Sequence, residues 1–296
     1  MINYNPKDWF TFIFRFHKSD TFRELFPLMV ALAIYCLLVS WVEIGFLKLS
    51  ENSRMKNLSI MHTMLTFVIS MLLVFRTNTA YERWWEGRKL WGALVNSSRS
   101  LAFKVSILIP KDDNLSRITI ANLLSAYAKS LQVHLSDSDV YEDIVRGDLC
   151  FVGGGKSEQH QPNLVLKALI NTLYTLRNSG KLTDCDLFML NNELTGFADI
   201  CGGCERIKLT PIPFSYSVFL KKFIFFFVMT LPITLVFSLG YFCVPVVLFI
   251  FYVLTSIELI AEEIEDPFGG DSNDLPLLSI ANKIEQSVFD IFNILR

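Results

Sequence analysis

Charged residues are scarce in this chain of 296 residues: Asp, Glu, Lys and Arg together make up 19%, against about 25% in an average soluble domain. Hydrophobic residues make up 52% and include 26 Phe. The formal net charge is only -2, so the chain as a whole has no electrostatic attraction for nucleic acid. This composition is typical of a membrane protein, and no nucleic-acid partner is expected.

Cysteine is too sparse for a disulfide framework. A secreted, disulfide-stapled miniprotein needs several Cys pairs in a short chain, whereas this long chain has six in all: Cys36, Cys150, Cys185, Cys201, Cys204 and Cys243. Cys201 and Cys204 have a spacing found in redox and zinc sites, but no second Cys pair or clustered His completes a tetrahedral site. We favour two thiols in a tight turn over a metal site at this pair.

A catalytic constellation is missing as well. The chain has four scattered His residues: His17, His62, His134 and His160. No Ser or Cys stands in a recognisable nucleophile context. Gly155-Lys156-Ser157 resembles the end of a phosphate-binding loop, but Cys150 stands where that motif requires an earlier Gly. The sequence therefore does not support an enzyme, and neither a catalytic residue nor a cofactor is expected.

Long apolar runs are what the chain does have. Residues 26–47 contain Glu43 as their only Asp, Glu, Lys, Arg or His, and residues 58–75 form a second run. At about 1.5 Å per residue, the first run crosses a hydrocarbon core of about 30 Å, while the second is slightly short. No small-residue cleavage site follows the first run, so it is expected to be an anchor rather than a signal peptide.

A third run, residues 223–257, contains no charged residue. As one helix, its roughly 35 residues would be about 52 Å long, which is too long for a single crossing. Gly240 lies between the halves that contain Pro232 and Pro245, and Gly tolerates the backbone angles of a tight reversal. The run is expected to turn at Gly240, which gives four membrane helices in total.

Lys and Arg are distributed unevenly around these runs. Four precede the first run, eighteen lie between Arg76 and Lys222, and none lie at Gly240. Because basic residues favour the cytoplasmic side, both termini are expected in the cytoplasm, although the loop around Lys48 opposes this weakly. We expect a multi-pass protein in the lipid bilayer of the plasma (inner) membrane.

The expected fold class is an all-α membrane protein with a helical cytoplasmic domain, because the polar region shows helical periodicity rather than strand alternation. In that region we expect helices over 81–109, continuing straight from the second run, and over 117–134, 162–178 and 183–201. The expected parts are a cytoplasmic N-terminal segment (1–25), two transmembrane helices (26–75), the helical cytoplasmic domain (76–222), a transmembrane hairpin (223–257) and an acidic cytoplasmic C-terminal segment (258–296).

Acidic residues crowd the segment after the third run. Seven lie within seventeen residues that contain no Lys or Arg: Glu258, Glu262, Glu263, Glu265, Asp266, Asp271 and Asp274. Glu262, Asp266, Asp271 and Asp274 are candidates for a site that attracts cations or holds a divalent ion, whereas the simpler interpretation is a solvated acidic segment. Residues 271–275 fail the alternating pattern of an EF-hand calcium loop.

Four ordered strings are spread over most of the chain: FRTNTAYERWWEGRKLW at 75–91, GCERI at 203–207, TPIPFSY at 210–216, and EEIEDPFG at 262–269 followed by NDLP at 273–276. Together these strings resemble the bestrophin family, most closely its bacterial branch. The resemblance implies a homopentameric ion channel for inorganic ions, with one central pore, a neck lined by the second transmembrane helix and a second constriction in the cytoplasmic part.

Matched by position, the resemblance implies neck side chains at Phe67, Met71 and Phe75, which a helix places on one face over about 12 Å. Five copies of each would form apolar rings that hold water poorly, so we expect a hydrophobic gate there. The alternative is ordinary helix packing. The resemblance also implies a cytoplasmic aperture at Cys185, where a small thiol would widen the opening.

Calcium regulation and ion selectivity differ within the family. Its animal members bind calcium through a long acidic cluster that residues 266–274 match only in diluted form, which argues against calcium gating. Animal relatives resemble anion channels, whereas a bacterial relative can prefer monovalent cations. The acidic segment weakly favours cations here. A chloride- or anion-selective channel is the alternative, and a membrane-anchored binding or signalling protein is a less favoured one.

Overall fold

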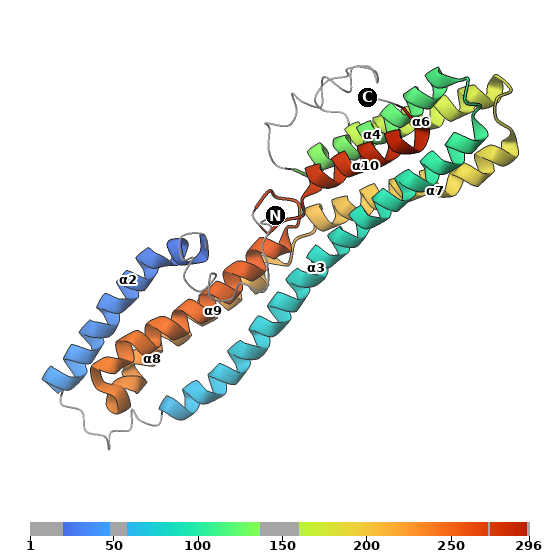
Figure 1. Ribbon diagram of the computed structural model, residues 1–296. Helices are drawn as coiled ribbons and strands as arrows, with labels where there is room; N and C mark the ends of the chain where they lie inside the picture. The colour runs from blue at the N-terminus through green and yellow to red at the C-terminus, as the bar shows by residue number, and fades with distance from the viewer. Residues whose placement is uncertain (1–19, 48–57, 137–159, 272, 295–296) are drawn as a thin grey trace. The chain divides into compact units, whose positions relative to one another are not determined.

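A computed structural model describes residues 20–47, 58–136, 160–271 and 273–294 (Figure 1). All regular elements in these ranges are helical, in agreement with the expected fold class. In chain order they are α2 (Asp20–Trp41), the π-helix η2 (Val42–Leu47), α3 (Leu58–Leu108), α4 (Asn114–Leu135), α6 (Gln161–Asn178), α7 (Asp184–Leu209), α8 (Phe214–Leu239), the 3-10 turn η6 (Gly240–Phe242), α9 (Cys243–Glu265) and α10 (Leu277–Phe292).

The chain forms two compact units. Of the described residues, 20–47, 58–82 and 211–265 form one unit, which we call the apolar unit, and 83–136, 160–210, 266–271 and 273–294 form the other, which we call the polar unit. Helix α3, at 51 residues, contributes to both, as expected for a second apolar run that continues without a break into the polar region. The unit boundaries follow from packing alone, so the membrane boundaries expected at 75, 222 and 257 stay predictions.

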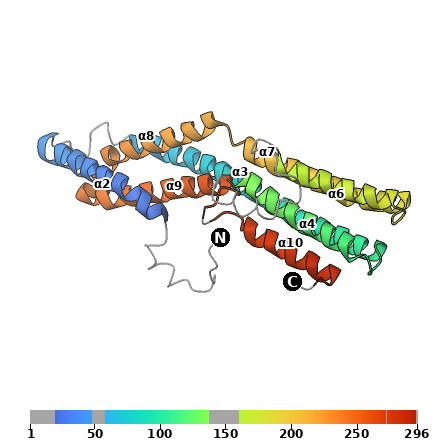
Figure 2. The same ribbon diagram turned by 90° about the horizontal axis from the view of Figure 1, so that it is seen from above.

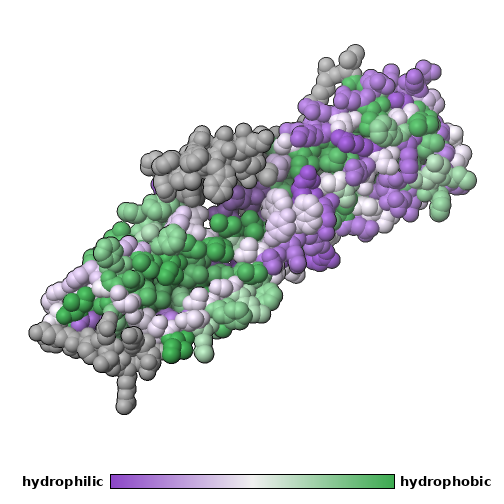
Figure 3. All heavy atoms as spheres, turned by 60° about the horizontal axis from the view of Figure 1, so that its bottom comes forward, coloured by the Kyte–Doolittle hydropathy of each residue, from purple (hydrophilic) through white to green (hydrophobic). Residues whose placement is uncertain are grey.

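Among the described residues, three segments are long and apolar enough to cross a membrane. They are Thr21–Gly45, Ser59–Leu108 and Phe214–Glu265, with hydropathies of 2.3, 1.6 and 2.4 in their most apolar windows. Only 22% of each window is buried within the chain, so most of these apolar side chains face outward, and Figure 3 shows them on the surface. Such a surface is unstable in water and requires lipid or further protein against it.

The third of these segments folds back on itself, as expected. Helices α8 and α9 pack against each other, and Gly240 ends α8 with a φ of 53°, a left-handed conformation that Gly adopts readily. The turn expected at Gly240 is therefore confirmed. Both helices extend beyond the charge-free run, because α8 begins at Phe214 and α9 continues to Glu265.

The polar unit is a helical bundle. Helix α4 packs against α6 and α10, and α6 packs against α7 (Figures 1 and 2). Its core includes Trp91, Tyr127 and Phe197, each nearly inaccessible to solvent. The helices expected over 117–134, 162–178 and 183–201 are confirmed as α4, α6 and α7, although α7 continues to Leu209.

Helix α10 was not expected, because residues 258–296 were interpreted as one acidic segment. Its buried side chains lie at helical spacing along one face: Leu277, Ala281, Ile284, Glu285, Val288 and Phe292. This three-to-four spacing is the signal of an amphipathic helix. The interpretation from sequence gave weight to the acidic residues before this helix and overlooked the apolar pattern that follows them.

Candidate pore residues and a buried ion-pair network

Helix α3 has a buried side and an exposed side within the apolar unit. Ile69 and Leu73 are almost completely buried in the core between the helices. The three residues expected at the neck are instead exposed by 72%, 50% and 52%: Phe67, Met71 and Phe75. They share one face and take no part in the core of the chain, so lipid, a second copy or a pore remains to contact them. Their role in the neck stays a prediction.

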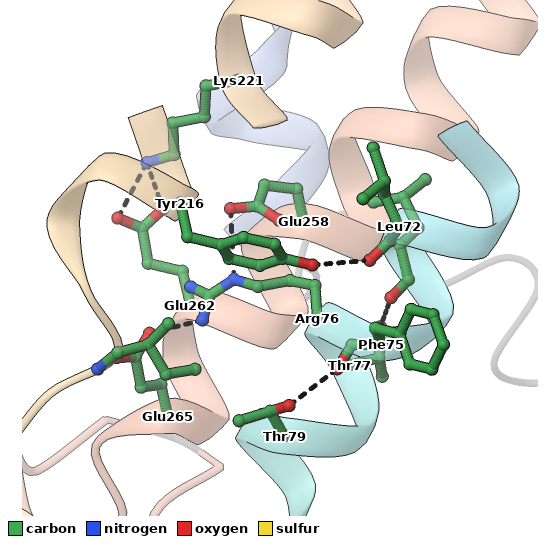
Figure 4. A network of polar contacts seen from close by, with 12 residues as sticks. Leu72, Phe75, Arg76, Thr77, Thr79, Tyr216, Lys221, Glu258, Glu262 and Glu265 are labelled. Carbon is green, nitrogen blue, oxygen red and sulfur yellow. Dashed lines mark hydrogen bonds and ion pairs between the residues drawn. The ribbon is translucent and has the colours of Figure 1, made fainter. Parts of the chain in front are cut away.

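Arg76 follows this face and turns inward. Its side chain is 1% exposed, with Nε 3.5 Å from Glu258 Oε1 and Nη1 2.7 Å from Glu265 Oε2. Figure 4 shows the guanidinium between the two carboxylates, which both come from α9. Glu258 is only 2% exposed. Because a buried charge is very costly without a partner, this ion pair fixes α3 against α9.

Polar contacts with α8 and the residues before it extend this network (Figure 4). The Tyr216 hydroxyl donates to the Leu72 carbonyl at 3.1 Å. The backbone N–H of Ile212 donates to the second carboxylate oxygen of Glu265 at 2.7 Å. Together with the Arg76 ion pairs, these bonds hold the base of the exposed apolar face of α3 in a fixed orientation.

The acidic stretch after the third apolar run is therefore not a set of unpaired carboxylates. Glu258 and Glu265 pair with Arg76. Glu262, a candidate for attracting ions, accepts two hydrogen bonds from Lys221 Nζ at 2.9 and 2.7 Å. The interpretation from sequence counted these charges but could not see their partners, which come from positions far away in the chain. Arg and Lys neutralise much of the negative charge that favoured cations.

The remaining acidic candidates belong to the polar unit. Asp274 is buried, and its Oδ2 accepts the backbone N–H groups of Gly270 and Asp271, each at 2.6 Å. Burial raises the pKa of Asp274 above its ordinary value, and these two hydrogen bonds oppose the shift. Asp266 Oδ1 accepts the N–H of Phe268 at 3.2 Å. The carboxylates thus shape the loop, and a divalent ion there stays a prediction.

The strings that carry the family resemblance meet around α3 in the polar unit. A Cβ on Gly87 would lie 3.2 Å from both Phe268 and Pro267, so the Asp-Pro-Phe-Gly string packs directly on α3. Arg83 donates to the carbonyls of Ile207 and Thr210 at 2.6 and 2.5 Å. These strings therefore share a structural task, because each fixes a loop or a helix end to α3.

Cys185 lies in the first turn of α7 and is exposed. The turn is fixed by a capping box in which Thr183 and Asp186 exchange hydrogen bonds between side chain and backbone. Such a cap satisfies backbone N–H groups that the first turn leaves unpaired. The thiol thus stands on a defined helix end, and its assignment to a cytoplasmic aperture stays a prediction.

Comparison with known proteins identifies the family. The family model of bacterial and fungal bestrophin proteins matches residues 1–290. The chain belongs to the bestrophin family. Its relatives include the voltage-dependent anion channel-forming protein alr2987 of Nostoc sp., which is 36% identical over 232 residues, 76% of this chain and 75% of the relative. YneE of Escherichia coli K12, of the same description, is 37% identical over 227 residues, 75% of this chain and 73% of the relative.

Solved bestrophin structures agree with this assignment. A bacterial bestrophin homologue from Klebsiella pneumoniae has a TM-score of 0.78 and 28% sequence identity, covering 90% of this chain and 98% of its own. Bestrophins are ion channels, so the expectation that the chain is not an enzyme is confirmed by its family. Arg76 and its partners were missed from sequence. The signal that could have found them is an ionisable residue directly after an apolar run: Arg76 follows residues 58–75, and Glu258 follows residues 223–257.

Proposed function

We propose that this bestrophin is a homopentameric anion channel of the plasma (inner) membrane, with Phe67, Met71 and Phe75 of α3 at the neck of its pore. The family and the names of the relatives support channel activity. The exposed apolar face of α3 supports the position of the neck. In a symmetric ring, a pore common to all subunits lies on the symmetry axis, and that face is available to line it.

Two observations favour anions over the cation preference inferred from the acidic segment. The relatives are named anion channel-forming proteins. In addition, Arg76 and Lys221 pair with three of the carboxylates on which the cation preference depended. A carboxylate that already has a cationic partner contributes little to the local cation concentration. We therefore adopt the anion alternative.

The neck acts as a gate because its apolar side chains hold water poorly. An ion in a narrow ring of Phe and Met side chains loses hydration and gains no ligand in return, so entry is opposed unless water fills the neck. Arg76 and Tyr216 hold the adjoining turns of α3. A small movement of these contacts would therefore change the width of the rings.

The three long apolar segments leave most of their surface exposed. This exposed apolar surface supports four helices that cross the bilayer, with both termini in the cytoplasm.

The test is the reversal potential of the purified protein in planar bilayers with asymmetric KCl. An anion channel is expected to reverse near the equilibrium potential of chloride, and replacement of chloride by a large organic anion should reduce the current. Reversal near the potassium potential would overturn the anion assignment and restore the cation alternative. Absence of any current in correctly inserted protein would favour a membrane-anchored binding protein.

A further inference from the structure

Three potential metal ligands converge in the polar unit. His134 lies in the last turn of α4, His160 is the N-cap residue of α6, and Glu205 lies on α7. Their ligand atoms all lie within 4.8 Å of one another. His134 Nε2 is 2.8 Å from Glu205 Oε1, and His160 Nε2 contacts the same oxygen.

Helix packing produces this convergence. The α4–α6 and α6–α7 contacts bring the end of α4, the start of α6 and the C-terminal half of α7 together. The two imidazole rings have their centroids 4.5 Å apart, so both present Nε2 to one carboxylate oxygen. All three side chains are about one-third exposed, at 34%, 33% and 27%. An ion from solution can therefore reach the cluster.

We propose that His134, His160 and Glu205 form a binding site for zinc. Two imidazole nitrogens and one carboxylate oxygen are a ligand set that Zn²⁺ prefers, with the metal about 2.0 to 2.2 Å from each atom. In a tetrahedral site such ligand atoms lie about 3.3 Å apart. The 2.8 Å distance between His134 Nε2 and Glu205 Oε1 must therefore lengthen slightly, and a separation as wide as 4.8 Å must shorten. Water takes the fourth position, because the cluster is open to solvent.

Binding changes the hydrogen bonds of His160. Its Nδ1 now accepts the backbone N–H of Asn163 at 3.3 Å, a long bond. A neutral imidazole that coordinates zinc through Nε2 carries its proton on Nδ1, so this capping bond is exchanged for the metal bond. The proton on Nδ1 then points to solvent, which the one-third exposure of the ring permits.

The thiol of Cys201 lies next to the three proposed ligands. It lies one helical turn before Glu205, and its Sγ is 3.8 Å from Glu205 Oε1. Burial raises the pKa of this thiol to about 12, so it is protonated in the absence of metal. The thiol is adjacent to the site but is not needed for it, and the three ligands above suffice with a water molecule.

The experiment uses the full-length protein in detergent, freed of metal with a chelator and titrated with Zn²⁺ by calorimetry. We expect one tight site per chain. Loss of an outer-shell partner of a metal site weakens affinity about 10- to 100-fold, so His134→Ala, His160→Gln and Glu205→Gln should each weaken it by at least about tenfold. Asp199→Asn, which changes an exposed carboxylate on the same helix, should leave the affinity unchanged.

Co²⁺ provides a readout that does not depend on the folding of a variant. Bound to the unmodified protein, it should give the intense visible absorption of a tetrahedral site, and Zn²⁺ should displace it. X-ray absorption should show imidazole scattering around zinc. The proposal is wrong if the unmodified protein binds no zinc, if the His134→Ala/His160→Gln double variant binds as tightly, or if the bound metal lacks imidazole ligands. The cluster would then be a hydrogen-bonded contact only.

Discussion

The apolar and polar units use the same element, the α-helix, but hold several of their charged side chains with different kinds of partner. In the apolar unit, Arg76 and Glu258 are buried against each other where α3 meets α9. In the polar unit, many charges lie at the surface or cap helices, such as the Asp113 carboxylate that caps α4. A buried pair is geometrically demanding because each charge depends on its partner. The comparison predicts that removing one member of the buried Arg76–Glu258 pair has larger consequences than removing one member of an exposed pair.

The largest effect is expected from breaking the buried pair. Arg76→Met leaves Glu258 buried without its cation, which should lower the free energy of unfolding by about 3 to 5 kcal/mol. Thermal melting of the detergent-solubilised protein measures this loss. Lys221→Met is the matched control, because Lys221 and Glu262 are each about half exposed and such pairs contribute at most about 1 kcal/mol. Equal losses in both variants would contradict the account.

The second prediction concerns the exposed face of α3. Changing Phe67, Met71 or Phe75 to Ala should widen the neck and let water persist in it, so anion flux into proteoliposomes should rise several-fold. Each substitution should lower the free energy of unfolding by less than the loss of about 3 to 5 kcal/mol expected for Phe→Ala in a packed core, because the three side chains are exposed. Phe249→Ala on α9 is the control, because Phe249 is 67% exposed but is not on the proposed neck. Similar flux changes at Phe249 would remove the special role of α3.

A smaller effect is expected at the cytoplasmic aperture. Cys185→Phe adds bulk to an exposed position in the first turn of α7, so it should reduce single-channel conductance without changing the melting temperature. A bulky thiol reagent should act in the same way on the unmodified channel. If conductance is unchanged after complete modification, Cys185 does not line the pore.

The smallest effect is expected from Glu262→Gln. Since Lys221 already pairs with this half-exposed carboxylate, removing its charge should change the ratio of chloride to potassium permeability only slightly. Reversal potentials before and after the substitution provide the ratio. A shift of selectivity from cations towards anions would show instead that Glu262 faces the conduction path and attracts cations.

Much of the fold could be predicted because it follows from local patterns. Apolar runs predicted the helices of the apolar unit, Gly240 predicted the hairpin turn, and helical periodicity predicted α4, α6 and α7. These signals depend on residues close together in the chain. Helix ends were less accurate, since α8 and α9 extend past the charge-free run once their charged side chains find partners.

The interactions between distant residues could not be predicted in this way. Arg76 pairs with carboxylates at 258 and 265, and the cluster of His134, His160 and Glu205 spans three helices. No spacing rule connects such positions, so the charges appeared unpaired and the His residues appeared scattered. The face of α3 was predictable because positions 67, 71 and 75 share one helix side whatever the rest of the chain does.

The most direct test of the proposed neck is thiol modification of Met71→Cys in a Cys185→Ser background, recorded in planar bilayers. A water-soluble thiol reagent should reach position 71 through the pore and block the current, because its adduct fills an apolar ring on the axis. The same reagent should leave the current of Phe249→Cys unchanged. Complete modification of Met71→Cys, confirmed by mass spectrometry, with no change in current would contradict the assignment of this face of α3 to the pore.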